Sequence, residues 1–300
     1  MKFHPLLVAF LATTAAASCA NFTWTGTVDA NWNTAANWTG GAPASANTTA
    51  LVFDSGAQVV TVNNINGGLV LNSLSISSAS PARTFNGNLL RFAGTSPQIN
   101  LATTGGHTVI SAPLQLDANL RTNSPANFVS HLRIPGNVSG TGGIIAHQGV
   151  TELTGTNIFT GATVVRNGGL LGVAGGGVAG SSGISVETGG EFQLLKNTFV
   201  SRPMTLSGGL TSSARQNVIF GGTSPSCEYS GAISVVGDSE IRAFSGSDSS
   251  LEAMVVFPVS GAVNLAGGDL IASTEGPGNT LKFSSVITGT GDVTAEAADG

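Results

Sequence analysis

Residues 150–173, VTELTGTNIFTGATVVRNGGLLGV, constrain the fold more than any other part of the chain. The apolar runs at 150–153, 163–165 and 170–173 are long enough for strands and too short for helices. The intervals between these runs are rich in Gly, Asn and Thr, a composition that is typical of turns. The segment therefore predicts three short strands joined by tight turns.

Two of these predicted strands meet at a corner, residues 154–162. We expect Gly155, Asn157 and Gly161 to turn the chain through left-handed backbone angles, which Gly and Asn tolerate best. Phe159 is the only aromatic residue of the corner. We expect its ring to point into a hydrophobic core.

The segment resembles the autotransporter-associated β-strand repeat. Ile158 and Phe159 depart from the family, which has Thr and Tyr at these two positions. The resemblance implies a secreted, right-handed parallel β-helix and assigns no chemistry to any residue. The residues that carry the resemblance are Leu153, Gly155, Asn157, Thr160, Gly161, Thr163, Val165, Gly168, Leu170 and Val173.

The rest of the chain alternates short apolar runs with turn signals, and no window shows the i, i+3, i+4, i+7 spacing of a helix. Glycine pairs such as 67–68 and 267–268 separate the runs. Strands about every 8–12 residues are typical of all-β folds, sandwich and solenoid alike. The further predicted strands are 51–53, 59–62, 74–76, 89–92, 99–101, 108–110, 114–116, 128–134, 184–186, 192–195, 218–220, 233–236, 254–259, 263–265 and 281–283.

An internal repeat favours the solenoid. HLRIPGNVSGTGGI at 131–144 aligns without gaps on TLKFSSVITGTGDV at 280–293. Repeated units of this kind stack, because none can bury its hydrophobic face alone. We therefore predict an all-β, right-handed parallel β-helix over residues 50–300, with the handedness taken from the resemblance. The family repeat would occupy about 131–173, and a partial second copy about 280–300.

The first twenty residues, 1–20, predict an export signal. Lys2 precedes an apolar stretch at 6–12, and small residues run from Ala15 to Ala20. Cleavage after Ala20 would leave a secreted protein that begins at Asn21, and lipidation of Cys19 is the alternative. No later stretch has the ~18 apolar residues of a membrane helix.

Composition limits the classes of function. Charged residues make up only 9% of the chain, against 41% hydrophobic residues and a formal net charge of −5, so the chain should fold. Only 11 of the 300 residues are Lys or Arg. We therefore expect no nucleic-acid partner, since such a surface needs clustered positive charge. After signal cleavage Cys227 is the only cysteine, which excludes an intramolecular disulfide.

Residues 21–49 differ from the rest because they hold all three tryptophans, Trp24, Trp32 and Trp38. The end of a solenoid exposes unpaired backbone and apolar surface, so it needs a cap. We expect the segment to be that cap, with its indole rings buried. The alternative is a sugar-binding platform, since indole faces stack on pyranose rings.

No motif predicts a cofactor or metal site. Residues 175–180 satisfy G-x-G-x-x-G, but 184–186 predict a strand after them instead of the helix that a dinucleotide site needs. His107, His131 and His147 are not spaced as metal ligands. We expect each histidine at a strand edge or in a turn.

Acidic residues gather between Glu228 and Glu252. Asp238 and Glu240 would share one face of a strand at ~6.5–7 Å. That separation would suit sugar hydrolysis or a calcium-assisted lyase. The simpler interpretation, which we favour, is a strand that turns its polar face to water, so that replacing both residues leaves any activity unchanged. Glu152, the only carboxylate of 150–173, has no acidic partner nearby in sequence.

Together these features favour a non-enzymatic, exported bacterial protein with no catalytic residues and no cofactor. It would be a β-helical stalk that presents an adhesive surface, and its partners would be extracellular glycans or cell-surface molecules. The alternatives are a polysaccharide-active β-helix enzyme and a carbohydrate-binding module. Family members often end in a membrane β-barrel or a sorting segment. The resemblance therefore suggests an N-terminal piece of a longer protein, with a possible membrane anchor downstream of Gly300, and a truncated reading frame is the alternative.

Overall fold

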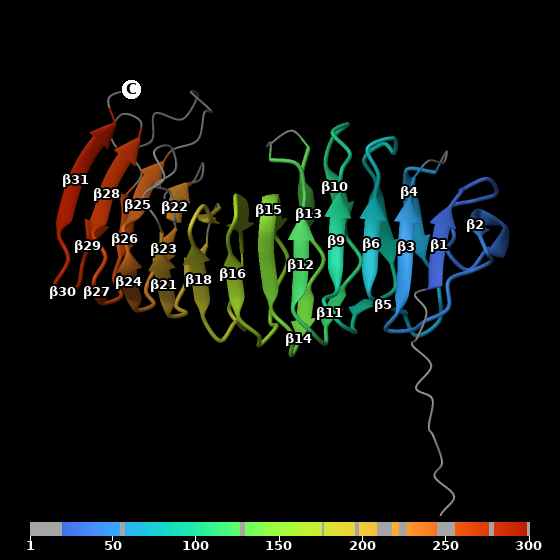
Figure 1. The fold of residues 1–300 in the computed structure, drawn as a ribbon, viewed down its shortest axis with the longest axis horizontal. Helices are drawn as coiled ribbons and strands as arrows, with labels where there is room; N and C mark the ends of the chain where they lie inside the picture. Colours follow the sequence, from blue (N-terminus) through green and yellow to red (C-terminus); the bar gives the residue numbers. More distant parts are fainter. Residues whose placement is uncertain are drawn as a thin grey trace, which may run out of the picture.

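The computed structural model describes residues 20–54, 58–126, 130–175, 177–195, 198–208, 218–221, 227–244, 256–275 and 279–298. In these ranges the strands stand side by side along one long axis (Figure 1). The single helical turn among them is the 3-10 helix η1 (Ala35–Asn37). The predicted export signal up to residue 19 lies outside the described residues.

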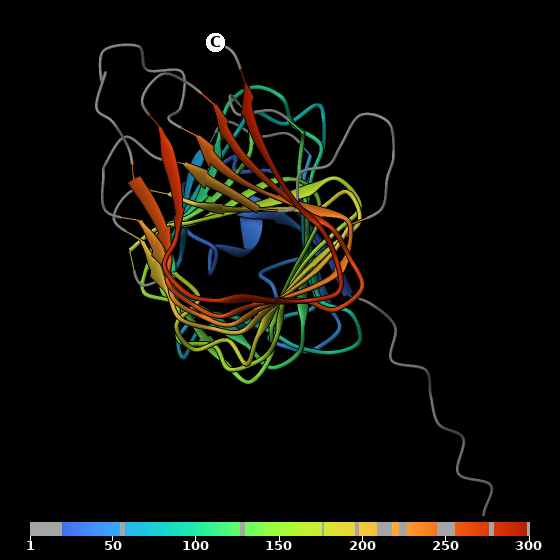
Figure 2. The same cartoon turned by 90° about the vertical axis from the view of Figure 1, so that its left-hand side faces the viewer.

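Each coil of the chain adds one strand to each of two long parallel sheets, sheet A and sheet B, and many coils add a third strand to a shorter sheet. Equivalent positions of sheet A are 25 residues apart between Ser73 and Gln98, but only 19 apart between Ile145 and Val164. Viewed along the stack, the sheets surround a common interior (Figure 2). The fold is therefore all-β and solenoid-like.

Sheets A and B extend over the whole stack. Sheet A contains β1 (Ala20–Trp24), β3 (Thr49–Phe53), β6 (Ser73–Ile76), β9 (Gln98–Leu101), β12 (Leu120–Asn123), the first half of β15 (Ile144–Leu153), β16 (Thr163–Val165), β18 (Ile184–Glu187), β21 (Met204–Ser207), β24 (Ile233–Gly237), β27 (Val263–Leu265) and β30 (Ile287–Gly289). Sheet B contains β4 (Val60–Asn63), β7 (Thr84–Gly87), β10 (Thr108–Ile110), β13 (Leu132–Ile134), the second half of β15, β17 (Gly169–Val173), β19 (Glu191–Leu194), β22 (Val218–Gly221), β25 (Ser239–Phe244), β28 (Leu270–Glu275) and β31 (Val293–Ala298).

The third side of the stack is divided between two short sheets. Sheet C contains β5 (Leu69–Leu71), β8 (Leu90–Phe92), β11 (Leu114–Leu116) and β14 (Val138–Gly140), and sheet D contains β20 (Phe199–Val200), β23 (Glu228–Tyr229), β26 (Val256–Val259) and β29 (Thr280–Phe283). Between β14 and β20 the third side consists of turns, joined to sheet C by one bridge from Val138 to Asn157. The only antiparallel pair among the described strands joins β1 to β2 (Trp38–Thr39).

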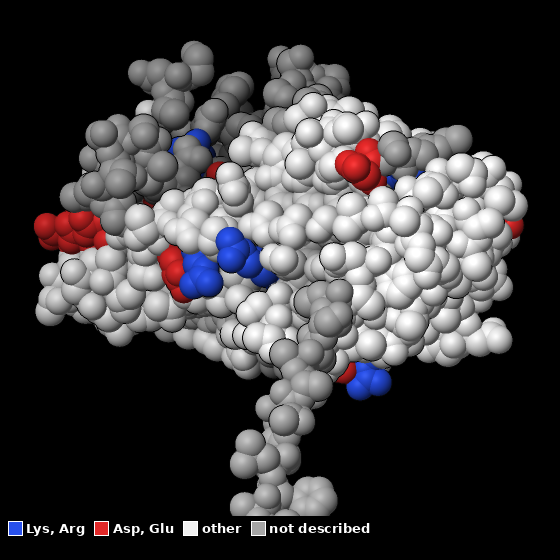
Figure 3. All heavy atoms as spheres, turned by 45° about the vertical axis from the view of Figure 1, so that its right-hand side comes forward, with Lys and Arg blue, Asp and Glu red and all other residues white. Residues whose placement is uncertain are grey.

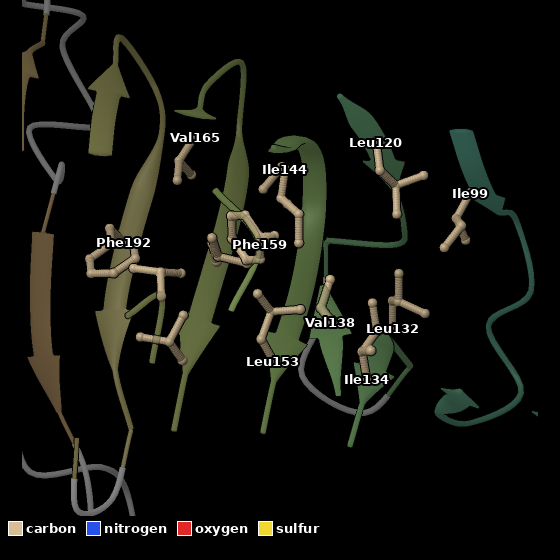
Figure 4. Packing of buried hydrophobic residues seen from close by; sticks show 14 of the residues in the cluster. Ile99, Leu120, Leu132, Ile134, Val138, Ile144, Leu153, Phe159, Val165 and Phe192 are labelled. Atoms are coloured by element: carbon tan, nitrogen blue, oxygen red, sulfur yellow. The ribbon is translucent and has the colours of Figure 1, made fainter. Parts of the chain in front are cut away.

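The core runs along the axis, because strand residues alternate between the interior and the outside. In β5, for example, Leu69 and Leu71 are buried while Val70 between them is partly exposed. Figure 4 shows side chains from the different sheets meeting in the interior, among them Leu120 of sheet A, Leu153 of sheet B and Val138 of sheet C. Each such side chain contributes roughly 1.5–3 kcal/mol when fully buried. Stacked coils therefore share one continuous hydrophobic core.

The strand predictions are confirmed wherever the structure describes them. Every predicted apolar run contains a strand, and the three runs of 150–173 are the second half of β15, β16 and β17. Phe159 is fully buried in the core, as expected (Figure 4).

The prediction of left-handed turns at Gly155, Asn157 and Gly161 is wrong, because none of the three has a positive φ. The two glycines are needed for a different reason, the close approach of successive coils. A Cβ atom on Gly155 would lie 2.6 Å from the Gly136 carbonyl oxygen, and one on Gly161 would lie 2.3 Å from the Gly143 nitrogen. The left-handed turn lies further on, at Asn167 and Gly168.

The two copies of the internal repeat form the same local unit on different sides of the stack. Residues 131–144 place β13 in sheet B and β14 in sheet C, whereas 280–293 place β29 in sheet D and β30 in sheet A. The coils differ in length, so the same strand-turn-strand sequence falls at a different point of the winding. The repeat therefore marks a local unit and not an equivalent position in the coil.

Candidate functional site

The corner at 154–162 uses its polar groups to join one coil to the next. Asn157 is fully buried, and its Nδ2 donates hydrogen bonds to the carbonyl oxygens of Gly155 (3.0 Å) and Gly177 (2.8 Å). The Thr163 hydroxyl donates to the Ser181 hydroxyl at 3.1 Å, again across coils. These contacts are structural, because each joins one coil to the next.

The three tryptophans of 21–49 pack against one another inside the first coils. Trp24, Trp32 and Trp38 are 0%, 0% and 4% exposed, and Trp38 Nε1 donates to the Trp32 carbonyl oxygen at 2.9 Å. The rings of Trp32 and Phe85 are 6.0 Å apart, and those of Trp24 and Phe53 are 5.8 Å apart. No indole face is therefore available to stack on a sugar, which removes the basis of the platform interpretation.

The glycine-rich segment 175–180 is followed by strand β18, as predicted, and not by a helix. The described part of the segment forms turns. Cys227 is buried and its thiol lies 2.8 Å from the Leu195 carbonyl oxygen. The glycine-rich segment therefore lacks the following helix that a dinucleotide site needs.

Asp238 and Glu240 do not form a carboxylate pair. Asp238 precedes β25, and its Oδ1 accepts a hydrogen bond from the Asp269 backbone nitrogen at 3.1 Å. Glu240 is only 6% exposed, so the prediction that this strand turns its polar face to water is wrong there. Its Oε1 atom accepts hydrogen bonds from Arg242 Nε (3.0 Å) and the Ser273 hydroxyl (2.5 Å). These two donors satisfy the carboxylate that burial removes from water. Glu252, at the other end of this acidic region, lies outside the described residues.

A different carboxylate, Glu191, lies in the same column of sheet B as Glu240. Phe192 and Ile241 both pair with Val218 of β22, so Glu191 and Glu240, one residue earlier in their strands, are two strands apart. That spacing corresponds to ~9–10 Å between backbones. Burial raises the pKa of Glu191 to about 7, Arg242 lowers it and Glu240 raises it further. No sequence motif marks Glu191, because only the register of three strands brings it near Glu240.

A second polar cluster lies on sheet B around β10, β13 and β15, where coils bring together residues that the sequence separates. The His107 and His131 rings are 4.3 Å apart, and His131 Nε2 lies 3.1 Å from Glu152 Oε2. Arg133 Nε donates to the same carboxylate oxygen at 2.9 Å. Although burial acts in the opposite direction, His131 and Arg133 hold the pKa of Glu152 below its usual value. His107 and His131 each lie directly before a strand, β10 and β13, as expected, whereas His147 lies within β15.

These clusters do not add up to a metal centre. In the described part of the chain, no group of three His, Cys, Asp or Glu side chains is arranged to hold a metal ion. Burial, followed by the charges of Arg133 and His131, lowers the pKa of His107, so a neutral imidazole is favoured there. The edge-to-face contact of the two rings and the ion pair between Arg133 and Glu152 are a sufficient account of this cluster.

Two further findings bear on function. No helix in the described ranges is long and apolar enough to cross a membrane. In comparisons with known proteins, no family model, no curated protein and no solved structure matches the chain.

Proposed function

We propose that this chain is a non-enzymatic, exported structural protein, a right-handed β-helical stalk that holds an adhesive or binding surface away from the cell. We assign it on its residues 150–173 to proteins with the autotransporter-associated repeat. Its partners are extracellular glycans or other cell-surface molecules.

One observation carries this proposal: the central residues of the corner at 154–162 serve to stack coils. Asn157 bonds to the next coil, Gly155 and Gly161 permit close backbone contact, and Phe159 fills the core. A sequence selected for stacking is what a rigid stalk requires, because each coil is stabilised by its neighbours. Low charge on the outer faces leaves few sites for nonspecific ionic contact.

We also propose that residues 21–49 cap the first coil. β1 already has a partner on both edges, β2 on one side and β3 on the other. The buried rings of Trp24, Trp32 and Trp38 cover the apolar interior that would otherwise be open. Such cover prevents edge-to-edge association of sheets.

Two measurements test the proposal. Expressed with its own signal, the protein is expected outside the cell with Asn21 as its first residue, and a cytosolic protein with residues 1–20 intact would contradict export. A lipid-modified Cys19 would replace simple secretion by membrane anchoring. Purified residues 21–300 should release no reducing ends or unsaturated products from a polysaccharide panel, with or without calcium.

One observation favours a second candidate, a polysaccharide-active enzyme. Glu191, with a pKa raised to about 7, and Glu240, which is bonded to Arg242, are two carboxyl groups in different environments on one sheet. Such a difference is the usual mark of an acid and base pair. Turnover of any polysaccharide that is lost in Glu191→Gln, a variant that keeps the shape of the side chain, would establish this candidate and exclude the stalk.

A further inference from the structure

The outer face of sheet A carries a concentration of positive charge. Figure 3 shows a molecule whose surface is mostly uncharged, with basic and acidic side chains gathered at a few places. One cluster combines Arg121 of β12, His147 of β15 and Arg166, which directly follows β16. These residues belong to three successive coils, so the winding brings them together although the sequence separates them by 45 positions from Arg121 to Arg166.

The hydrogen-bonding groups of this cluster are mainly donors. Arg121 Nη2 lies 3.0 Å from His147 Nδ1, and Asn167 Nδ2 lies 3.0 Å from His147 Nε2. Arg166 Nη1 is 3.6 Å from Glu187 Oε2, too far for a good hydrogen bond. The Nε atom of Arg166 is buried and has no hydrogen-bond partner in the protein. A buried donor without a partner is costly, so an acceptor that reached it would stabilise this side chain.

The charges of the cluster do not balance. Two guanidinium groups, Arg121 and Arg166, face one carboxylate, Glu187, and all three side chains are at least partly exposed. Burial lowers the pKa of His147, and the charges of Arg121 and Arg166 lower it further. Both of these charges are positive, so the imidazole lies in their positive field. An added negative charge would relieve that field.

We propose that Arg121, His147, Arg166 and Asn167 form a binding site for an oxyanion, the sulfate or carboxylate group of an acidic polysaccharide. Guanidinium groups recognise such planar or tetrahedral anions through paired N–H donors. Two arginines suffice for one anionic group and fall short of the many phosphate contacts that a nucleic acid requires. The polymeric source rests on the proposed extracellular function, whereas the oxyanion site rests only on this geometry.

The first experiment uses inorganic sulfate and the imidazole of His147. Binding of sulfate and protonation of His147 must favour each other, because each stabilises the other's charge. In an NMR titration of residues 21–300, sulfate is therefore expected to raise the pKa of His147, while His107 serves as an internal control that should not respond. Affinity for sulfate should rise as the pH falls through the pKa of His147. An unchanged His147 titration at saturating sulfate would overturn the site.

Substitutions of the two arginines test whether these residues bind the sulfate. Arg121→Gln and Arg166→Gln are each expected to weaken sulfate binding at least tenfold and to abolish the response of His147. Arg91→Gln is the control, because Arg91 lies on sheet C and already has a partner, Asp117, at 2.6 Å. Equal weakening in the control and the two site variants would mean general charge attraction and would reject the site. Unfolding in urea, measured on each variant, ensures that the folded protein is compared.

The last experiment tests whether the site binds the oxyanion on a polysaccharide or only as a free inorganic ion. Dextran sulfate and polygalacturonate carry the oxyanion on a polymer, and neutral dextran lacks it. Binding of either charged polymer that is lost in Arg121→Gln, with none to neutral dextran, supports the full proposal. Binding of inorganic sulfate alone would keep the oxyanion site and reject the polysaccharide. Sulfate binding by a protein found in the cytosol would instead contradict only the proposed function.

Discussion

The first and the last described coils of this solenoid-like stack are built from the same parallel ladder but differ in what covers them. At the first coils, Trp24, Trp32 and Trp38 are buried together with the aromatic rings of Phe53 and Phe85. In the last coil, β29, β30 and β31 are paired on one edge only. Val286 and Val293 are 71% and 46% exposed there.

The difference teaches that strand pairing alone does not complete a coil. A coil buries its inner side chains only when another layer packs on it. At the first coils that layer is a short non-repetitive segment, and its large rings reach across the whole interior. In the last coil, Leu281, Phe283 and Ile287 touch the core but stay partly exposed. Stability should therefore fall along the stack, and substitutions at its two ends measure that gradient.

The largest effect is expected at the first coils. Trp32→Ala removes a fully buried ring from contact with Trp38 and Phe85 and should cost about 3–5 kcal/mol. Phe283→Ala in the last coil removes a partly buried ring and should cost only about 1–2 kcal/mol. Urea unfolding of both variants measures the difference, and equal losses would mean that the two ends are equally well covered.

Deletion of residues 21–41 should go further and cause aggregation, so a monomeric deletion variant of unchanged stability would reject the cap.

The coils between the ends depend on close backbone contact. Gly161→Ala would place a Cβ atom 2.3 Å from the Gly143 nitrogen, and we expect a loss of about 1–3 kcal/mol in the free energy of unfolding. Gly183→Ala is the matched control, because its Cβ would meet nothing closer than 3.6 Å. Its effect should stay within about 0.5 kcal/mol. Similar losses at both positions would show that the coils are not packed as closely as the structure has them.

Gly155 and Gly161 illustrate how far the sequence could predict the fold. Apolar runs and turn residues located the strands, because burial of alternate side chains is a local property. The reason for the glycines at 155 and 161 was missed, since it lies in contacts with coils about twenty residues away. That the two copies of the repeat lie on different sides of the stack could not be predicted either. Their place in the winding depends on the length of each coil, which the loops set.

The polar clusters were predictable only in part. Asp238 and Glu240 were noticed because they are close in sequence, yet their side chains have different partners. Glu191 and the pairing of His107 with His131 depend on register across strands, which no local spacing reveals. Which outward-facing residues of a stack are neighbours can be told only when the register between strands is known.

The later coils bury the carboxylate of Glu240, whereas the buried charge near the first coils is the guanidinium of Arg83. Glu240→Gln weakens the bond to Arg242 and should cost about 1.5–3 kcal/mol, the range of hydrogen bonds to charged groups. Asp238→Asn is the control and should change stability by less than about 0.5 kcal/mol. Urea unfolding of both variants measures these changes. If Glu240→Gln leaves the free energy of unfolding unchanged, the Glu240 carboxylate is solvated in the folded protein.

A pH dependence of stability should arise from Glu191. Its pKa in the folded protein is raised to about 7, so the folded state binds this proton more tightly than the unfolded state does. The free energy of unfolding should therefore decrease as the pH rises from about 4.5 to about 7, by roughly 1–3 kcal/mol at 1.36 kcal/mol per pKa unit. In Glu191→Gln this decrease should be absent. A variant with the same pH profile as the unmodified protein would assign the dependence to other groups.

The smallest effect on stability, and the most direct test of the two ends, comes from Val293→Lys in β31. Val293 is exposed and belongs to a strand with one free edge, so the substitution should change the free energy of unfolding by less than about 0.5 kcal/mol. A lysine on an edge strand opposes pairing with another sheet, so self-association of residues 21–300 should decrease. Val28→Lys is the matched control: Val28 is 59% exposed but lies in the tryptophan-containing segment, away from a free edge. Sedimentation velocity over a range of protein concentrations compares the three proteins. If Val28→Lys reduces association as strongly as Val293→Lys does, the added charge acts generally, and the contrast between the covered and the uncovered end does not govern association.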